Sequence, residues 1–204
     1  MKALITRKVG MTSTIAEDGA VQAMTLLAVD EHTVLTHKTA DRDGYSAVQL
    51  GAGTAKKLSK SVAGHVKAAK VMPKFIREFR IDEIPEELSV GAKISADVFN
   101  VGDTVHVTGL TKGKGWAGTI RRHNFHRQRK THGGKGNTRK PGSIGSMYPQ
   151  HILKGKRMAG QLGHDQVTVR NLKVALVDTE LGVIGVTGAV PGPRKGVVVV
   201  KGAK

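Results

Sequence analysis

Short runs rich in valine, leucine and threonine recur along most of the chain and are bounded by turn residues such as Asp18-Gly19 and Asp43-Gly44. Runs of this kind are typical of β-strands. They lie at Val21–Val29, Val34–Thr36, Ser46–Leu50, Thr104–Thr108, Val167–Asp178, Val183–Val190 and Val197–Lys201. Many short strands with turn signals between them favour a small β-barrel over a parallel α/β sheet. The pattern therefore predicts a mainly β protein.

The longest of these runs alternates between apolar and polar positions. Its apolar positions are Val167, Val169, Leu172, Val174 and Leu176. The alternation slips by one residue near Asn171, which predicts a β-bulge there and one buried face along the strand.

One segment instead shows helical spacing. Val62, Val66 and Ala69 recur at that spacing between Lys60 and Met72, and Pro73 is expected to end the helix. The acidic segment that follows surrounds Pro85 and is expected to form a solvated loop or a short helical turn. It contains Asp82, Glu83, Glu86 and Glu87.

The strand-forming segments are interrupted by a basic, glycine-rich stretch at residues 112–164, which we call the extension. Residues 1–111 are expected to form the first part of a β-barrel domain, with a helical insert at about 60–72, and residues 165–204 its final strands. A structureless segment of this length is expected in a compact domain only where it is functional or ordered by a partner.

The charge of the chain is concentrated in the same place. The 204 residues carry 33 Lys and Arg against 16 Asp and Glu, a formal net charge of +17. Between Lys112 and Lys173 there are fifteen cations and one carboxylate, Asp165, so +14 of the +17 lies there. The rest of the chain carries a net +3, which is ordinary for a soluble globular surface. Cations at this density repel one another unless a polyanion neutralises them, which points to nucleic acid phosphate.

Other partners and compartments fit less well. An anionic membrane would favour an amphipathic helix, and eleven glycines between Gly113 and Gly163 oppose one. No apolar run approaches the ~20 residues of a membrane-spanning helix, and the basic N-terminus argues against a secretory signal. The absence of cysteine excludes disulfides and thiol nucleophiles and fits a reducing cytosol.

Two motifs look catalytic but fail on inspection. Gly113–Gly118 fits G-x-G-x-x-G, yet no clear amphipathic helix follows and no acidic residue lies near 20 positions later. Ser143 sits in a segment like a nucleophile elbow, but Pro141 replaces the first glycine and no Asp or Glu is nearby. We therefore expect no enzymatic activity, no cofactor and no small-molecule substrate. An RNA-modifying enzyme would need the cofactor pocket or acid–base pair that the sequence lacks.

The histidines and aromatic residues of the extension are its other candidate contact residues. His123, His126 and His132 are loosely spaced and have no carboxylate partner, so we expect RNA contacts and no metal. Only Trp116, Phe125 and Tyr148 are aromatic there, which favours recognition of folded RNA by shape over reading of single strands. Trp116 has an alternative role as a core anchor where the extension leaves the barrel. A general nucleic-acid chaperone or DNA-compacting protein remains an alternative, although no helix suited to a major groove is evident.

Several long motifs, in one order, resemble the bacterial form of the large-subunit ribosomal protein L-three family. They are Lys8–Thr12, Val107–Trp116, Arg122–Phe125, Thr131–Gly133, Arg139–Gly145, Lys154–Gly160 and Gly188–Gly192. The resemblance implies a translation-factor-like barrel and an extension that penetrates folded 23S-class rRNA. It also implies neighbouring large-subunit proteins, a cytoplasmic ribosomal location, support of early subunit assembly and no catalysis.

Carried onto this chain, the resemblance assigns two sets of residues. The rRNA-binding set is Lys112, Lys114, Trp116, Arg121, Arg122, His123, His126, Arg127, Arg129, Lys130, His132, Lys135, Arg139, Lys140, Lys154, Lys156 and Arg157. The tip that approaches the peptidyl transferase centre is Ser146, Met147, Tyr148, Pro149, Gln150 and His151. Residues 146–153 lack the family's usual Thr-Pro-Gly and are about one residue shorter. Some bacterial members carry a methylated glutamine here, and Gln150 is the local candidate.

Overall fold

The computed structural model describes residues 1–15, 19–85 and 88–203. The chain divides into unit 1, Met1–Leu110 with Gln166–Lys204, and unit 2, Thr111–Asp165.

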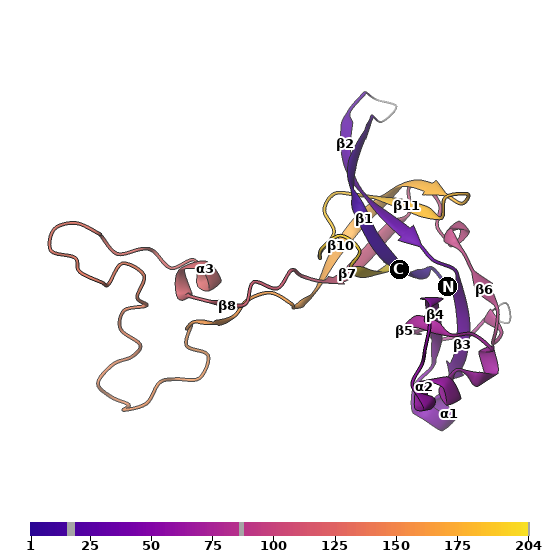
Figure 1. Ribbon diagram of the computed structural model, residues 1–204, viewed down its shortest axis with the longest axis horizontal. Coiled ribbons are helices and arrows are strands. Elements are labelled where there is room, and N and C mark those ends of the chain that lie inside the picture. Colours follow the sequence, from indigo (N-terminus) through magenta and orange to yellow (C-terminus); the bar gives the residue numbers. More distant parts are fainter. Residues whose placement is uncertain (16–18, 86–87, 204) are drawn as a thin grey trace. The chain divides into compact units, whose positions relative to one another are not determined.

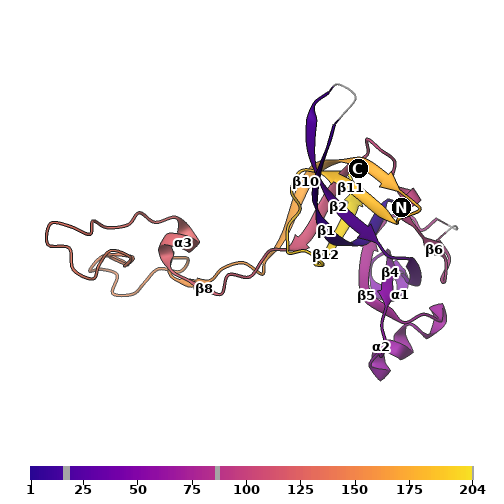
Figure 2. The same cartoon turned by 45° about the horizontal axis from the view of Figure 1, so that its top comes forward.

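Six antiparallel strands of unit 1 close into a barrel (Figure 1). They are β1 (Ala3–Ile15), β2 (Val21–Val29), β7 (Thr104–Leu110), β10 (Gln166–Asp178), β11 (Val183–Thr187) and β12 (Val197–Gly202). Their order around the barrel is β1-β12-β7-β10-β11-β2. Strands β1 and β2 continue beyond the barrel as a two-stranded hairpin (Figure 2). The predicted mainly β fold with a small barrel is confirmed.

Strand β10 contains the predicted bulge, but its buried face is shorter than expected. The pairing with β7 shifts between Val169 and Leu172, and Asn171 has a φ of 58°. A second shift occurs against β11 between Val174 and Leu176. Because this shift reverses the alternation, Leu176 is 41% exposed and Val177 packs on the core in its place. Val167, at the other end of the strand, is also 41% exposed. The prediction that Val167 and Leu176 belong to the buried face is therefore wrong.

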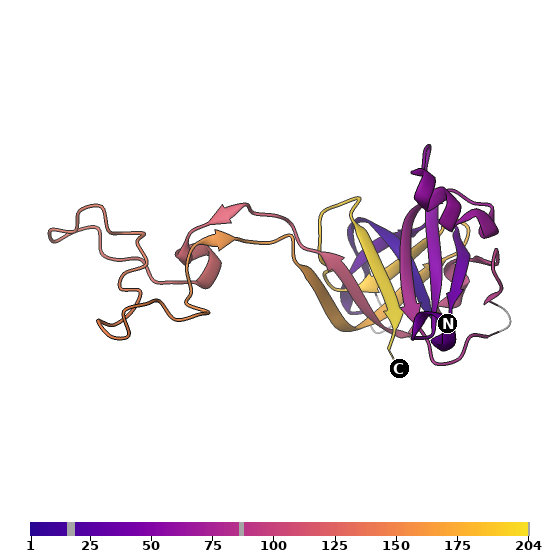
Figure 3. The same ribbon diagram turned by 90° about the horizontal axis from the view of Figure 1, so that it is seen from below.

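A second antiparallel sheet of unit 1 has the order β5-β4-β3-β6 (Figure 3). Its strands are β3 (His32–Lys38), β4 (Ala47–Thr54), β5 (Pro73–Arg80) and β6 (Lys93–Ile94). The helical segments of unit 1 are α1 (Ala40–Asp43), α2 (Lys60–His65) and the 3₁₀ turns η1 (Lys67–Ala69) and η3 (Ala96–Val98).

The helical segments differ in detail from the sequence pattern. The Ser59 side chain accepts a hydrogen bond from Val62 N and begins α2, and Lys70, with a φ of 52°, ends η1. Asp43-Gly44 lies in the connection between the antiparallel strands β3 and β4, as predicted, and Gly44, at a φ of 79°, ends the short helix α1 within that connection. The turn predicted at Asp18-Gly19 and the acidic residues Glu86 and Glu87 fall partly or wholly outside the described residues.

One hydrophobic core joins the two sheets of unit 1. Leu4, Leu27 and Val107 of the barrel and Val34 and Leu50 of the second sheet are buried in a single cluster. Phe99, 1% exposed, belongs to the same cluster and is among its largest side chains. The barrel and the second sheet are therefore expected to fold as one cooperative unit.

His32 is a buried histidine at the start of β3. Its Nε2 lies 2.8 Å from Ile5 N and 2.9 Å from Ile5 O, and no described group pairs with its Nδ1. Burial lowers the pKa of His32, and the hydrogen bond to Ile5 and the charge of Asp30 oppose only part of that effect. The folded protein therefore binds a proton on His32 less readily than the unfolded chain does.

This imbalance predicts that stability falls on mild acidification. The contribution of neutral His32 is complete above the ordinary histidine pKa of about 6.5. It is lost below that pH by up to about 1.4 kcal/mol per pH unit, until the lowered pKa of the folded state is reached. Urea unfolding between pH 5 and 7.5 should show this slope in the wild-type chain and a much smaller slope in His32→Gln. The exposed His126→Gln variant should keep the wild-type slope. Equal slopes in all three proteins would contradict the role assigned to His32.

Candidate nucleic-acid interface

The two ends of unit 2 are held side by side by backbone hydrogen bonds, and we call residues 111–117 and 160–165 the neck. Thr111 N donates to Asp165 O over 2.9 Å. Lys114 N donates to Leu162 O over 2.9 Å, and Leu162 N donates to Gly115 O over 3.0 Å. The short strands β8 (Trp116–Ala117) and β9 (Gly160–Gln161) pair next to these bonds. The neck therefore gives the extension an ordered base.

Two glycines let the neck close. Gly163 has a φ of 75°, and a Cβ there would lie 2.2 Å from Lys112 O. A Cβ on Gly160 would lie 2.6 Å from Arg122 Nη1. Gly163 is therefore required, because a side chain there would collide with backbone and the positive φ favours glycine. At Gly160 a side chain would instead displace the flexible Arg122 guanidinium.

A short helix, α3 (Thr119–His123), follows the neck, although no clear amphipathic pattern predicts one after Gly118. Arg122 Nη1 donates to Met158 O over 2.8 Å, and His123 Nε2 lies 3.0 Å from the same oxygen. Asn124, at a φ of 58°, ends the helix after five residues. The helix is thus held by polar contacts with the returning chain, which an apolar pattern does not reveal. Arg122 and His123, both predicted RNA contacts, also join the two sides of unit 2.

Beyond α3, residues 124–157 form turns and irregular structure. Gln128 N donates to Thr138 O over 3.1 Å and closes one loop of this segment. Every Lys and Arg of residues 112–157 is exposed. The ion pairs among the described residues all lie in unit 1 and involve Lys2, Arg7, Lys38, Arg42 and Lys93. The thirteen cations of unit 2 therefore face solvent without a carboxylate partner in the described chain.

Trp116 is 79% exposed, so the alternative that it anchors the core is wrong. Alternation along β8 explains its position, because the neighbouring Ala117 is 4% exposed and takes the inward place. His126 and His132 are also exposed. Within the described residues, no three His, Cys, Asp or Glu side chains are grouped to hold a metal ion. Trp116 and these histidines are thus available to a ligand that approaches unit 2 from outside.

The tip contains no Lys, Arg, Asp or Glu and is open to solvent. Met147 is 91% exposed and Tyr148 84% exposed. Ser143 Oγ donates to Gly145 O over 2.9 Å, and His151 N donates to Pro149 O over 2.8 Å. Large apolar side chains exposed in this way usually mark a contact surface.

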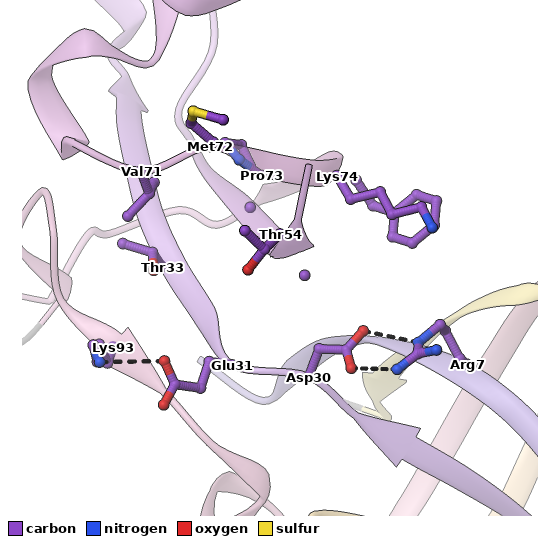
Figure 4. Close-up of a pocket in the computed structure, with 13 residues that line it drawn as sticks. Arg7, Asp30, Glu31, Thr33, Thr54, Val71, Met72, Pro73, Lys74 and Lys93 are labelled. Carbon is purple, nitrogen blue, oxygen red and sulfur yellow. Dashed lines mark hydrogen bonds and ion pairs between the residues drawn. The ribbon is translucent and has the colours of Figure 1, made fainter. Parts of the chain in front are cut away.

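Unit 1 contains a cavity of about 560 Å³ that sequence reasoning did not indicate (Figure 4). Arg7 binds Asp30 through two hydrogen bonds of 2.8 and 2.5 Å, and Lys93 lies 3.2 Å from Glu31. The hydrogen bond from Arg7 to Asp30 raises the pKa of the guanidinium. Both carboxylates of the cavity are thus engaged by cations, and the site offers no free acid–base pair.

No helix in the described part of the chain is long and apolar enough to cross a membrane.

Comparison with known proteins identifies the class of this chain. Residues 78–182 match the family model described as "Ribosomal protein L3", a segment that includes all of unit 2. A large ribosomal subunit protein uL3 from Pelotomaculum thermopropionicum is 44% identical over 205 residues, covering 99% of this chain and 97% of the relative. The chain is therefore a ribosomal protein rather than an enzyme.

Two further relatives agree. Large ribosomal subunit proteins uL3 from Bifidobacterium longum and Bacillus thuringiensis are 45% and 43% identical. Each alignment covers 99% of this chain and 96% or 97% of the relative. The chain belongs to the uL3 family of the large ribosomal subunit. The family resemblance of the sequence motifs and the expected absence of enzymatic function are confirmed by this membership.

Proposed function

We propose that the extension, residues 112–164, binds 23S-class rRNA as a polycationic strut. The observation that carries the proposal is the set of thirteen exposed cations of unit 2 that no described carboxylate neutralises. Each cation that contacts a phosphate releases counterions. Arginines such as Arg121, Arg127 and Arg139 also present a planar fork that fits phosphate oxygens and stacks on bases.

The finer roles follow the family resemblance. We propose that the tip, Ser146 to His151, approaches the peptidyl transferase centre and that the chain supports early assembly in the cytoplasm beside other large-subunit proteins. The uncharged, exposed tip supports a local contact there in place of phosphate binding. Whether Gln150 is methylated is tested by mass spectrometry of protein recovered from ribosomes, where an added 14 Da on this residue is expected.

The proposal predicts steep salt dependence. With roughly eight phosphate contacts, the extension alone should lower log affinity by about seven per decade of salt, so the full chain should show at least this slope. The measurement is filter binding of the full chain to 23S rRNA transcribed in vitro, over a series of potassium chloride concentrations. A slope near zero would rule out the polycation account.

Two controls separate the alternatives. Duplex DNA of equal length should bind more weakly at the same salt, whereas equal binding would favour a general nucleic-acid chaperone. In a sucrose gradient of cell lysate, the chain should sediment with the large subunit.

A further inference from the structure

The small net charge of unit 1 conceals a second basic segment. No carboxylate occurs between Asp43 and Glu78. The same interval holds seven cations, which are Lys56, Lys57, Lys60, Lys67, Lys70, Lys74 and Arg77. The positive and negative charges of unit 1 therefore nearly cancel only when they are summed over the whole unit, because its carboxylates lie elsewhere along the chain.

The structure gathers five of these lysines around α2 and η1. We call Lys56, Lys57, Lys60, Lys67 and Lys70 the lysine surface, and all five are exposed. The other side of α2 and η1 is anchored, because Val66 and Ala69 are buried in a small cluster with Leu35 of β3. The lysines therefore project from a platform that is packed against the second sheet.

The lysine surface borders a hollow of about 520 Å³. Lys56, Lys57, Lys67 and Lys70 line it together with the apolar residues Leu58, Ala63, Val66, Val71 and Met72. A hollow of this volume lies within the range of small-ligand sites, about 300–1,000 Å³. Its lining joins cationic groups suited to phosphates with apolar contacts suited to the face of a base or sugar.

No described group of the chain neutralises these lysines. The ion pairs among the residues of unit 1 that the structure describes use other cations, namely Lys2, Arg7, Lys38, Arg42 and Lys93. Glu78, the next carboxylate along the sequence, accepts hydrogen bonds from Tyr45 OH at 2.8 Å and from Gln49 Nε2 at 3.0 Å. An uncompensated cluster of five exposed cations attracts an anionic partner from outside.

We infer that the lysine surface is a second RNA-binding surface, which holds backbone phosphates of rRNA and seats an unpaired nucleotide in the hollow. The inference rests on the proposed binding of rRNA by this chain. RNA is favoured over a lipid surface because α2 has only six residues and presents no long apolar face. RNA is favoured over a protein partner because the chain belongs to the large ribosomal subunit, where rRNA supplies phosphates at high density.

The test compares two triple variants of equal charge. Lys57→Gln/Lys67→Gln/Lys70→Gln removes three cations of the lysine surface. Lys2→Gln/Arg42→Gln/Lys93→Gln removes three cations that already lie within 4 Å of Asp103, Asp43 and Glu31. Each full-length variant is bound to protein-free 23S rRNA at 0.15 M salt, and thermal unfolding checks that both remain folded.

Loss of three phosphate contacts should weaken binding on the order of 100-fold and reduce the salt slope by about three. The control variant should bind within a few-fold of wild type. In addition, acetylation of the wild-type chain should be slowed at Lys57, Lys67 and Lys70 when rRNA is present. Unchanged acetylation of these lysines would overturn the inference.

A third variant separates the two proposals. Arg127→Gln/Arg129→Gln/Lys130→Gln removes three cations from the extension. If this variant binds weakly and the lysine-surface variant binds as wild type, the inference is wrong and the proposed function stands. If neither variant loses affinity, the proposed function fails as well. If the lysine-surface variant binds rRNA normally but no longer sediments with the large subunit, the surface binds a protein, which also overturns the inference.

Discussion

A shortened chain in which Asn-Gly replaces residues 111–165 should fold into the same barrel and lose most of its affinity for rRNA. Leu110 of β7 and Gln166 of β10 are direct partners in the antiparallel pairing. Asn-Gly suits a two-residue hairpin turn between such partners. The large core cluster of unit 1 contains no residue of the removed segment, so the midpoint of thermal unfolding should stay within about 5 °C of wild type.

The loss of binding should be large because the removed segment carries thirteen cations. Affinity for 23S rRNA at 0.15 M salt should fall on the order of 10³-fold or more, and the salt slope should fall by about seven. The residual slope should be about three, from the lysine surface. A full-length chain with the same thirteen cations changed to Gln is the matched control and should bind as weakly. Unfolding of the shortened chain would contradict the independence of unit 1, and wild-type affinity would contradict the role of the extension.

Strands that are rich in β-branched or aliphatic residues were predictable from the sequence. Strands that form because they pair with a neighbouring strand were not. Strand β5, Pro73–Arg80, is half charged, and it is a strand because it pairs with β4 from Ala47↔Arg80 to Thr54↔Pro73. In β1, Gly10, Ser13 and Thr14 dilute the apolar pattern, yet pairing with β2 continues to Ile15↔Val21. Because β-propensity depends on cross-strand neighbours, such strands need the tertiary structure to identify them.

The two basic surfaces likewise differ in how far the sequence alone reveals them. The extension was evident because its thirteen cations lie close together in sequence and no carboxylate occurs between Asp103 and Asp165. The lysine surface has a comparable signal, the carboxylate-free interval from Gly44 to Arg77, but a net charge summed over unit 1 hides it. The hollow between Lys57 and Lys70 depends on how α2 and η1 pack on Leu35, which no spacing rule gives.

The neck was only partly predictable. A basic, glycine-rich segment leaving a barrel follows from composition, but the hydrogen bonds from Arg122 and His123 to Met158 O join residues 35 or 36 positions apart. Polar contacts of that range leave no periodic trace in the sequence. The alternative that Trp116 anchors the core fails for a related reason, since a two-residue strand is too short for alternation to show which side chain points inward.

Phe99→Ala should be the most destabilising single substitution in unit 1. Phe99 is 1% exposed and lies directly after η3, outside any strand. It belongs to the core cluster that includes residues of both sheets. Removing a buried phenylalanine costs about 3–5 kcal/mol through lost burial and the cavity left behind. That is a large share of the roughly 5–15 kcal/mol by which a domain is stable.

Urea unfolding at pH 7.5, where His32 is neutral in both states, measures this loss. Phe99→Leu keeps most of the volume and should cost less than about 1.5 kcal/mol, and Phe125→Ala, a half-buried residue of unit 2, should leave the main transition unchanged. Because core residues of the barrel and the second sheet lie in one cluster, Phe99→Ala should shift a single transition. Two separated transitions would show that the sheets fold independently, and a loss below about 1 kcal/mol would show that the site collapses around the smaller side chain.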